Sequence, residues 1–260
     1  MYIVSDMTKI QEHIINTKNE FESSFMEGNY YNKQTRDETH RELILENLNI
    51  KRGSKILDLG TGNGFLAFAM AARNPYTQII GLDILDETLK RNRAKARELE
   101  LFNLNFFSYD GITFPFEENS FDVIVCRYSL HHFPDLENTF QEIGRALKIG
   151  GQLFISDPSP NDNDSCRFID EYMQMKQDGH IKFYTHDELN QIGQDFYLIE
   201  NSSFVSKLRF PRKEPDLYKE LLDRYEKEVI EGYEVEIFHN EIFITEKVNN
   251  ISFINCKGLF

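Results

Sequence analysis

The segment Lys55-Ile-Leu-Asp-Leu-Gly-Thr-Gly-Asn-Gly-Phe-Leu-Ala67 runs from an apolar stretch into three alternating glycines and then into Ala-rich sequence. This order predicts a short strand, a tight turn through Gly60, Gly62 and Gly64, and the start of a helix. Glycine lets a backbone turn sharply and approach a ligand without an obstructing Cβ. A helix start also presents unpaired N–H groups. The segment therefore predicts a nucleotide-type binding turn.

Two phosphate-binding patterns do not fit this turn. A P-loop places Lys and Ser or Thr after its glycines, and residues 58–72 contain no Lys or Arg. A dinucleotide loop needs a third Gly or Ala for close helix packing, but the bulky Phe65 stands at that position, counted from Gly60. An NAD-dependent oxidoreductase is therefore disfavoured.

Acidic residues near the ends of three predicted strands favour a cationic ligand instead. Asp58 precedes the glycines, Asp83 ends the next predicted strand, and Asp110 ends the third. Carboxylates attract the sulfonium and ammonium groups of S-adenosylmethionine, whereas Asp58 would repel a pyrophosphate. An acid about twenty residues beyond the first glycine is suited to accept both ribose hydroxyls. The charge pattern thus predicts S-adenosylmethionine as the cofactor.

The chain from about Gly53 to Asp157 resembles the class I S-adenosylmethionine-dependent methyltransferases. It is most similar to the methyltransferase type 11 group, which includes quinone-biosynthesis C-methyltransferases. The resemblance rests on Ile56–Gly64, Gly81-Leu-Asp83, Tyr109-Asp-Gly-Ile112, Phe114–Asp122, Val123–Phe133 and Ile143–Leu153. It implies a Rossmann-like, doubly wound α/β fold whose seven-stranded, mostly parallel sheet has a C-terminal antiparallel strand and helical lid insertions.

Composition limits the compartment and the partners. The chain has 260 residues, a net charge of −14 and three scattered cysteines, so that neither a disulfide scaffold nor a metal site is expected. Nucleic-acid binding is disfavoured because phosphate neutralisation needs a basic surface. No apolar run approaches the length of a membrane span, and no signal peptide is visible. We expect a cytoplasmic protein, monomer or homodimer, that acts on a small molecule.

The organisation predicted along the chain has two parts. Residues 1–50 form an N-terminal helical cap, and residues 51–260 form the domain that binds S-adenosylmethionine. Lid insertions are expected at about 160–184 and 210–231, with a capping box at Thr185 opening a helix between them. Alternating apolar residues predict two antiparallel strands, Phe196–Leu208 and Tyr233–Val248.

The cofactor site is expected at the carboxyl ends of the parallel strands. In the resembled family the glycine motif cradles the methionine part, the second motif binds the ribose and the third meets the adenine. Carried over, these roles give the cofactor-binding residues Asp58, Gly60, Thr61, Gly62, Asn63, Gly64, Asp83, Ile84, Asp110, Gly111, Arg127 and Tyr128.

Hydroxyl or carbon-acid acceptors require a base, and histidine titrates in the appropriate range. His131 and His132 follow the fourth predicted strand and are the candidate catalytic residues; either could instead cap the next helix or pack in the core. The candidate acceptor-binding residues are Tyr128, His132, Asp157, His180 and Tyr184. A protein that binds S-adenosylmethionine only to regulate or activate a partner is the alternative function.

Overall fold

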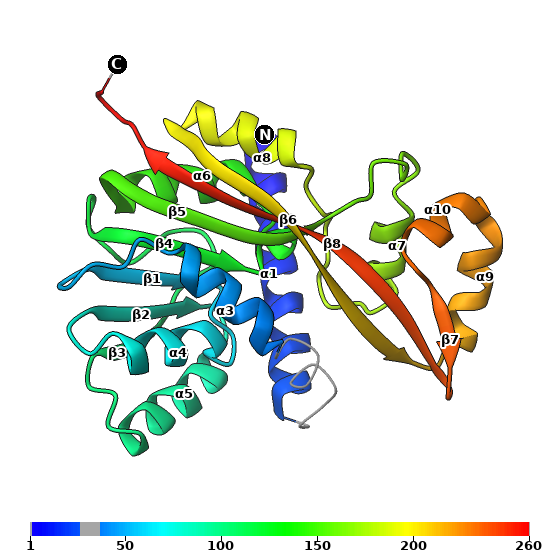
Figure 1. Cartoon of the computed structure of the whole chain (residues 1–260), viewed down its shortest axis with the longest axis horizontal. Helices are drawn as coiled ribbons and strands as arrows, with labels where there is room; N and C mark the ends of the chain where they lie inside the picture. Colours follow the sequence, from blue (N-terminus) through cyan, green and yellow to red (C-terminus); the bar gives the residue numbers. More distant parts are fainter. Residues whose placement is uncertain (1, 27–36, 260) are drawn as a thin grey trace.

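The computed structural model describes residues 2–26 and 37–259. Its centre is a sheet in the strand order β3-β2-β1-β4-β5-β8-β6, and β7 pairs with β8 at one end (Figure 1). The strands are β1 Lys55–Leu59, β2 Gln78–Asp83, β3 Leu104–Ser108, β4 Phe121–Arg127, β5 Leu147–Ser159, β6 Leu198–Lys213, β7 Glu236–Phe238 and β8 Glu241–Asn255. β1 to β5 are parallel, and β8 runs antiparallel to both β5 and β6. The predicted fold class is confirmed.

Helices cover both faces of the sheet, because successive residues of each buried strand point to opposite sides. Ile56 and Val125 face a core shared with α3 Glu38–Asn47, α4 Phe65–Arg73 and α5 Asp86–Glu98. Leu57 and Ile124 face a second core shared with α6 Leu136–Ala146 and α8 His186–Asp195. A right-handed βαβ crossover produces this arrangement whenever parallel strands alternate with helices.

β6 and β8 continue well beyond the rest of the sheet and carry a separate helical unit at their far end (Figure 1). Its helices are α7 Phe168–Gln174, α9 Asp216–Arg224 and α10 Lys227–Gly232. They enclose a third apolar core with the outer parts of both strands, including Phe168, Tyr233 and Ile244, all fully buried. We call this unit the lid.

The C-terminal strand pair differs from the sequence prediction. Residues 210–213 belong to β6 rather than to an insertion, and the strand expected at Tyr233–Val248 is replaced by β7, a turn and β8. His239 and Asn240 form that turn with φ of 48° and 62°. Two left-handed residues suit a two-residue hairpin, but His-Asn is a much weaker signal for it than Asn-Gly.

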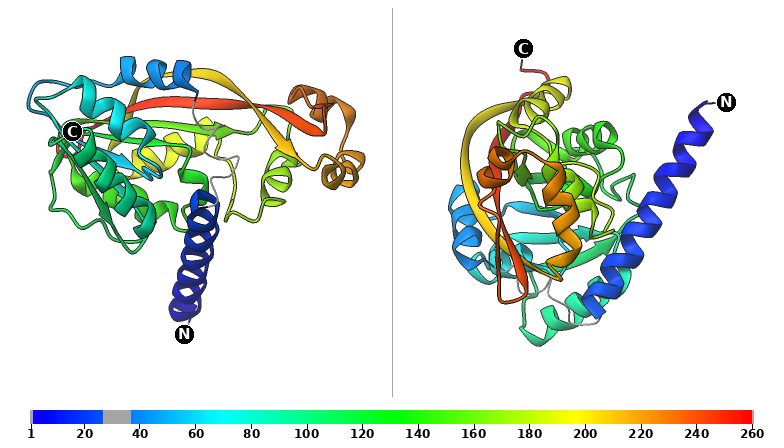
Figure 2. Two further views of the ribbon diagram at one scale, coloured as in Figure 1. Left: turned by 90° about the horizontal axis from the view of Figure 1, so that it is seen from below. Right: turned by 90° about the vertical axis from the view of Figure 1, so that its right-hand side faces the viewer.

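The N-terminal region contains α1 Tyr2–Met26 and α3, while residues 27–36 of the predicted cap lie outside the described residues. The two additional views in Figure 2 show α1 lying along the side of the molecule, with its N-terminal end directed away from the body. None of the helices in residues 2–26 and 37–259 combines the length and the apolar character that a membrane crossing requires.

Candidate functional site

A cleft opens where β1, β2 and β4 end, and it encloses about 930 Å³ of unfilled space, open solvent included. Nine of the predicted cofactor residues line it: Gly60, Thr61, Gly62, Asn63, Asp83, Ile84, Gly111, Arg127 and Tyr128. Asp58, Gly64 and Asp110 are not among the lining residues. We call this space the donor cleft.

The glycine turn is folded against its neighbours without room for side chains. Gly60 has φ of 69°, and a Cβ there would lie 2.0 Å from Ser129 Oγ. The N–H groups of Gly60 and Thr61 both donate to the Leu82 carbonyl, 2.9 and 3.1 Å away. This position therefore requires glycine for both conformation and space.

Asp58 holds the turn from beneath. Its Oδ2 accepts hydrogen bonds from Thr61 Oγ1 at 2.7 Å and from the Ala67 N–H at 3.2 Å. Burial raises the pKa of Asp58 to about 7, although both hydrogen bonds oppose the shift. The structure thus joins Asp58 to the turn and to the start of α4.

Asp83 lies in the donor cleft at the end of β2 and is 8% exposed. Its two carboxyl oxygens accept the N–H groups of Gly62 at 2.7 Å and Ile84 at 2.8 Å. Burial raises the pKa of Asp83 to about 6, against the effect of these hydrogen bonds. A cation or a pair of hydroxyl groups entering the cleft would favour the charged carboxylate.

The third predicted acid points elsewhere. Asp110 is exposed, and its Oδ1 accepts the N–H groups of Ile112 and Thr113 at 2.9 and 2.8 Å. Its neighbours Tyr109 and Gly111 line the donor cleft instead. Asp110 therefore shapes the turn that presents these two residues, because an Asx-type bond fixes the following backbone.

β4 ends at Arg127, which lines the cleft while remaining 9% exposed. Its guanidinium lies over the rings of Phe65 and Tyr128, at 5.1 and 4.9 Å from their centroids. Its Nε and Nη2 have no hydrogen-bond partner among the described residues. Burying guanidinium N–H groups without hydrogen-bond acceptors costs free energy, unless a ligand supplies those acceptors.

The two histidines after β4 occupy different environments. His131 is 3% exposed, and its Nδ1 pairs with Asp157 Oδ2 at 2.9 Å. Burial opposes a charge on His131, but the Asp157 carboxylate outweighs it and raises the pKa. His132 lines the donor cleft, and burial together with the neighbouring His131 lowers its pKa to about 3. His132 is therefore neutral at physiological pH.

The remaining predicted acceptor-binding residues do not converge on the cleft. Asp157 is buried and also accepts the Ser129 N–H at 2.9 Å. His180 is buried and pairs with Asp170, with the two rings of His180 and His131 at a centroid distance of 5.4 Å. Tyr184 lines a separate surface hollow.

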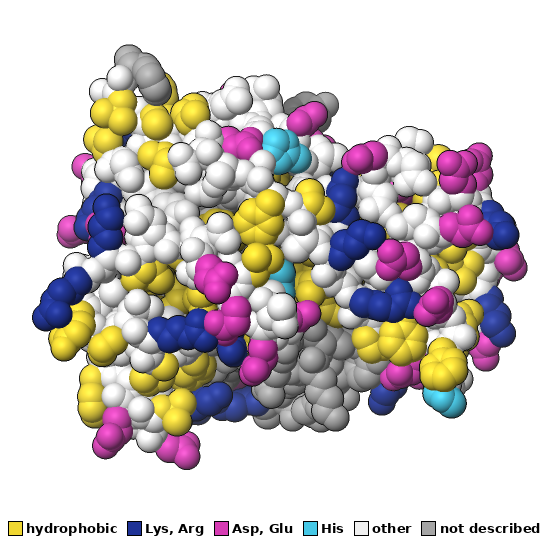
Figure 3. Space-filling model, viewed as in Figure 1, with side chains coloured by type: hydrophobic (Ala, Val, Ile, Leu, Met, Phe, Trp, Pro, Cys, Tyr) yellow, Lys and Arg dark blue, Asp and Glu magenta, His cyan; other side chains and the backbone are white. Residues whose placement is uncertain are grey.

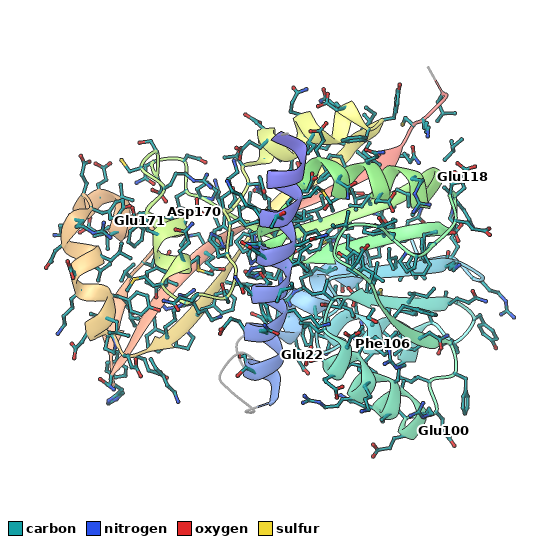
Figure 4. The ribbon with its side chains drawn as sticks, turned by 180° about the vertical axis from the view of Figure 1, so that it is seen from behind. Glu22, Glu100, Phe106, Glu118, Asp170 and Glu171 are labelled. Carbon is teal, nitrogen blue, oxygen red and sulfur yellow. The ribbon has the colours of Figure 1, made fainter. Side chains whose placement is uncertain are left out.

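The sequence predicts that the N-terminal helices form part of the roof over the acceptor pocket, but it does not indicate which residues of α1 line the donor cleft. Ile14, Thr17 and Phe21 line it, and Figure 4 shows α1 crossing between the sheet and the lid. Glu22, labelled there, accepts the Glu87 N–H at the start of α5 at 2.8 Å. Only the aromatic Phe21 is conspicuous in the sequence, since a helix that docks by tertiary contacts leaves no local motif.

Comparisons with known proteins agree with this geometry. Residues 50–205 match the model of a family described as a methyltransferase domain. The uncharacterized methyltransferase YcgJ of Bacillus subtilis is 30% identical over 142 residues, which are 54% of this chain and 55% of that protein. Its crystal structure superposes with a TM-score of 0.73 at 22% identity, covering 85% of this chain and all of that one (100%).

A demethylmenaquinone methyltransferase of Listeria monocytogenes is 32% identical over 123 residues, 46% of this chain and 52% of that protein. A geranyl diphosphate methyltransferase solved with S-adenosylmethionine has a TM-score of 0.63 at 18% identity, covering 84% of each chain. The chain spans about half the length of the curated relatives it matches. These matches confirm the predicted resemblance and the predicted cofactor class. The chain belongs to the methyltransferase-domain family.

Proposed function

We propose that this protein transfers a methyl group from S-adenosylmethionine to a small-molecule acceptor. The observation that carries the proposal is that one cleft is lined both by the buried Asp83 carboxyl and by Arg127, whose Nε and Nη2 lack a hydrogen-bond partner among the described residues. S-adenosylmethionine offers hydroxyls and positively charged groups to the Asp83 carboxyl, and it offers a carboxylate to the Arg127 guanidinium. The absence of space for a Cβ at Gly60 shows that the turn packs tightly against Ser129, and this packing fixes the shape of the turn at the edge of the cleft.

When bound, S-adenosylmethionine supplies an activated methyl group, so the chain mainly needs to align the acceptor with it. Asp83 holds the ribose, Tyr109 and Gly111 flank the adenine, and Arg127 holds the carboxylate. The glycine turn cradles the methionine part, while Asp58 acts one step back by fixing that turn.

His132 is the histidine that faces the methyl site. Its Nδ1 is buried and has no hydrogen-bond partner in the part of the chain that the structure describes, and a neutral imidazole can accept a hydrogen bond there. His131 positions its neighbour through the Asp157 pair, since it does not line the donor cleft. The predicted catalytic roles thus separate into acceptor contact for His132 and positioning for His131.

Two observations support a small acceptor. Apolar side chains make up much of the lining of the donor cleft, with Phe21, Leu85 and Phe133 among them. On the face in Figure 3, Lys and Arg side chains lie among Asp and Glu side chains, without a continuous basic surface in the described part. The demethylmenaquinone methyltransferases named above act, by their name, on a small molecule.

The test is formation of S-adenosylhomocysteine from S-adenosylmethionine in the presence of a mixed pool of small metabolites. Turnover should fall about tenfold or more in His132→Ala with little change in cofactor affinity. His186→Ala is the matched control, because His186 lies in the capping region of α8 outside the donor cleft. Cofactor binding without any S-adenosylhomocysteine would favour the regulatory alternative.

A further inference from the structure

Between the end of β4 and the lid lies a group of buried polar atoms that the donor cleft does not account for. His132 Nδ1 and His180 Nδ1 have no hydrogen-bond partner among the described residues, and Tyr128 Oη and Glu246 Oε2 have none there beyond the contact of Tyr128 with Glu246. Glu246 and His180 are only 2% and 7% exposed. Buried polar groups are normally satisfied, so two orphan ring nitrogens beside an isolated Tyr–Glu pair indicate a missing partner. We call this group the polar seam.

The seam is contiguous and touches the donor cleft. The His132 ring lies 4.2 Å from that of His131 and 6.3 Å from that of His180, measured between centroids. The Tyr128 ring lies 6.4 Å from that of His131, and its hydroxyl interacts with Glu246 on β8. Tyr128 and His132 also line the donor cleft. A ligand held by the seam would therefore lie next to the methyl site.

The backbone conformation of Tyr128 supports a functional role for the polar seam. Tyr128 has φ of 52°, a left-handed conformation that is unfavourable for an aromatic residue, and its N–H donates to the Ser156 carbonyl at 2.9 Å. This conformation directs the side chain from the end of β4 toward the lid, where its ring meets Phe210 at 5.8 Å. Strain of this kind persists where the surrounding structure holds it in place.

The charges around the seam discriminate between acceptor groups. Glu246 faces the cations Arg212, His131 and Lys176, of which Arg212 lowers its pKa most, although burial raises the pKa to about 7 overall. Asp178, the other carboxylate near His132, pairs with Lys176 at 3.2 Å. Each carboxylate therefore already has a cation beside it, so an ammonium group would have to compete with that cation, whereas a neutral hydroxyl group would not.

We propose that the polar seam is the acceptor site and that it holds a small acceptor through an uncharged hydroxyl group rather than through an ammonium group. This inference rests on the proposed methyl transfer. The hydroxyl donates a hydrogen bond to Tyr128 Oη, and Tyr128 in turn donates to Glu246. The cations around Glu246 stabilise the negative charge that develops on the oxygen as its proton leaves.

The proton and electron balance of the step is complete. An oxygen lone pair of the acceptor forms the new bond to the methyl carbon, while the electrons of the broken carbon–sulfur bond remain on sulfur. The hydroxyl proton passes to Tyr128 Oη as Tyr128 gives its own proton to Glu246. Glu246 then returns the proton to water when the product leaves.

The experiment uses the full-length protein and two probes of equal size, benzyl alcohol and benzylamine, the latter an ammonium ion near neutral pH. Calorimetry first confirms that S-adenosylhomocysteine binds; failure at that stage refutes the proposed function itself. Ligand-observed NMR on the saturated protein then gives the affinity of each probe. Benzyl alcohol should bind about tenfold more tightly than benzylamine.

Glu246→Gln and Tyr128→Phe should each weaken benzyl alcohol binding about tenfold, while Glu236→Gln, on the exposed strand β7, should leave it unchanged. Tyr128→Phe removes one hydroxyl only, so it carries the test if Glu246→Gln does not fold. Equal or tighter binding of benzylamine, no binding of benzyl alcohol, or unchanged affinity in both seam variants would each overturn the assignment.

Discussion

Replacing Asp157 by Asn should destabilise the protein by about 3 kcal/mol. The carboxylate is 2% exposed and serves two buried partners, His131 Nδ1 and the Ser129 N–H, each at 2.9 Å. Removing one member of a buried ion pair leaves the other uncompensated, which costs about 3–5 kcal/mol. Asn keeps the shape and one acceptor, so the lower end of that range applies.

The same pair has a defined pH dependence. The pKa of His131 is raised in the folded protein above its ordinary value of 6.5. Its contribution to stability is therefore complete below about pH 6.5 and is lost as the pH rises through the folded-state pKa. Asp157→Asn should be most destabilised at about pH 6 and less destabilised at about pH 9, because His131 is neutral at the higher pH.

Urea unfolding of the wild type, Asp157→Asn, His131→Asn and the double variant at both pH values measures this. The double-mutant cycle should give a coupling of about 2 kcal/mol at the lower pH. Asp162→Asn is the matched control, since its exposed pair with Lys247 should contribute under about 1 kcal/mol. A coupling near zero, or one that grows with pH, would refute the reasoning.

Three further predictions concern the turn, the helix over the cleft and the lid connection. Gly60→Ala should weaken S-adenosylmethionine binding at least about tenfold in calorimetry, because its Cβ would collide with Ser129. Gly53→Ala is the control, because Gly53 also has positive φ but has open space around it. This variant should lose about 1 kcal/mol of folding stability and keep its affinity for S-adenosylmethionine, and equal losses of affinity in the two variants would contradict the prediction. Glu22→Ala should speed cofactor release several-fold in stopped-flow fluorescence, because it removes the hydrogen bonds from α1 to Glu87 and Thr88 at the start of α5. An unchanged rate would show that this contact does not retain the cofactor. Thr185→Ala should cost about 1 kcal/mol in urea unfolding by breaking the capping box, and a cost near zero would count against that box.

The sheet could be predicted from the sequence because each of its signals is local. Gly60 and Gly64 indicate the turn after β1, and the buried strands contain continuous apolar runs such as Val123–Cys126. The capping box at Thr185 was predicted and is present with both of its hydrogen bonds. The long β6–β8 ribbon was only partly predicted, since the His239-Asn240 turn lacks a glycine.

The site was less predictable, because its polar contacts join distant segments. Asp58 lies one residue before the end of β1 and Asp110 two residues after the end of β3, yet each is engaged by backbone or hydroxyl groups that follow it in the chain. Glu246 has no motif around it, and it becomes a neighbour of Tyr128 only because β8 pairs with β5, the strand next to β4. Sequence position indicates which strand end a residue occupies, and the side-chain direction depends on tertiary packing.

The central claim is that the donor cleft binds S-adenosylmethionine through Asp83, and calorimetric titration of the wild type and of Asp83→Ala tests it most directly. The wild type should bind, and Asp83→Ala should bind at least about tenfold more weakly. Because the pKa of Asp83 is raised to about 6, wild-type affinity should also rise from about pH 5 to about pH 8, and the variant should lack that rise. Equal affinities for the two proteins, or no binding by the wild type, would contradict the claim.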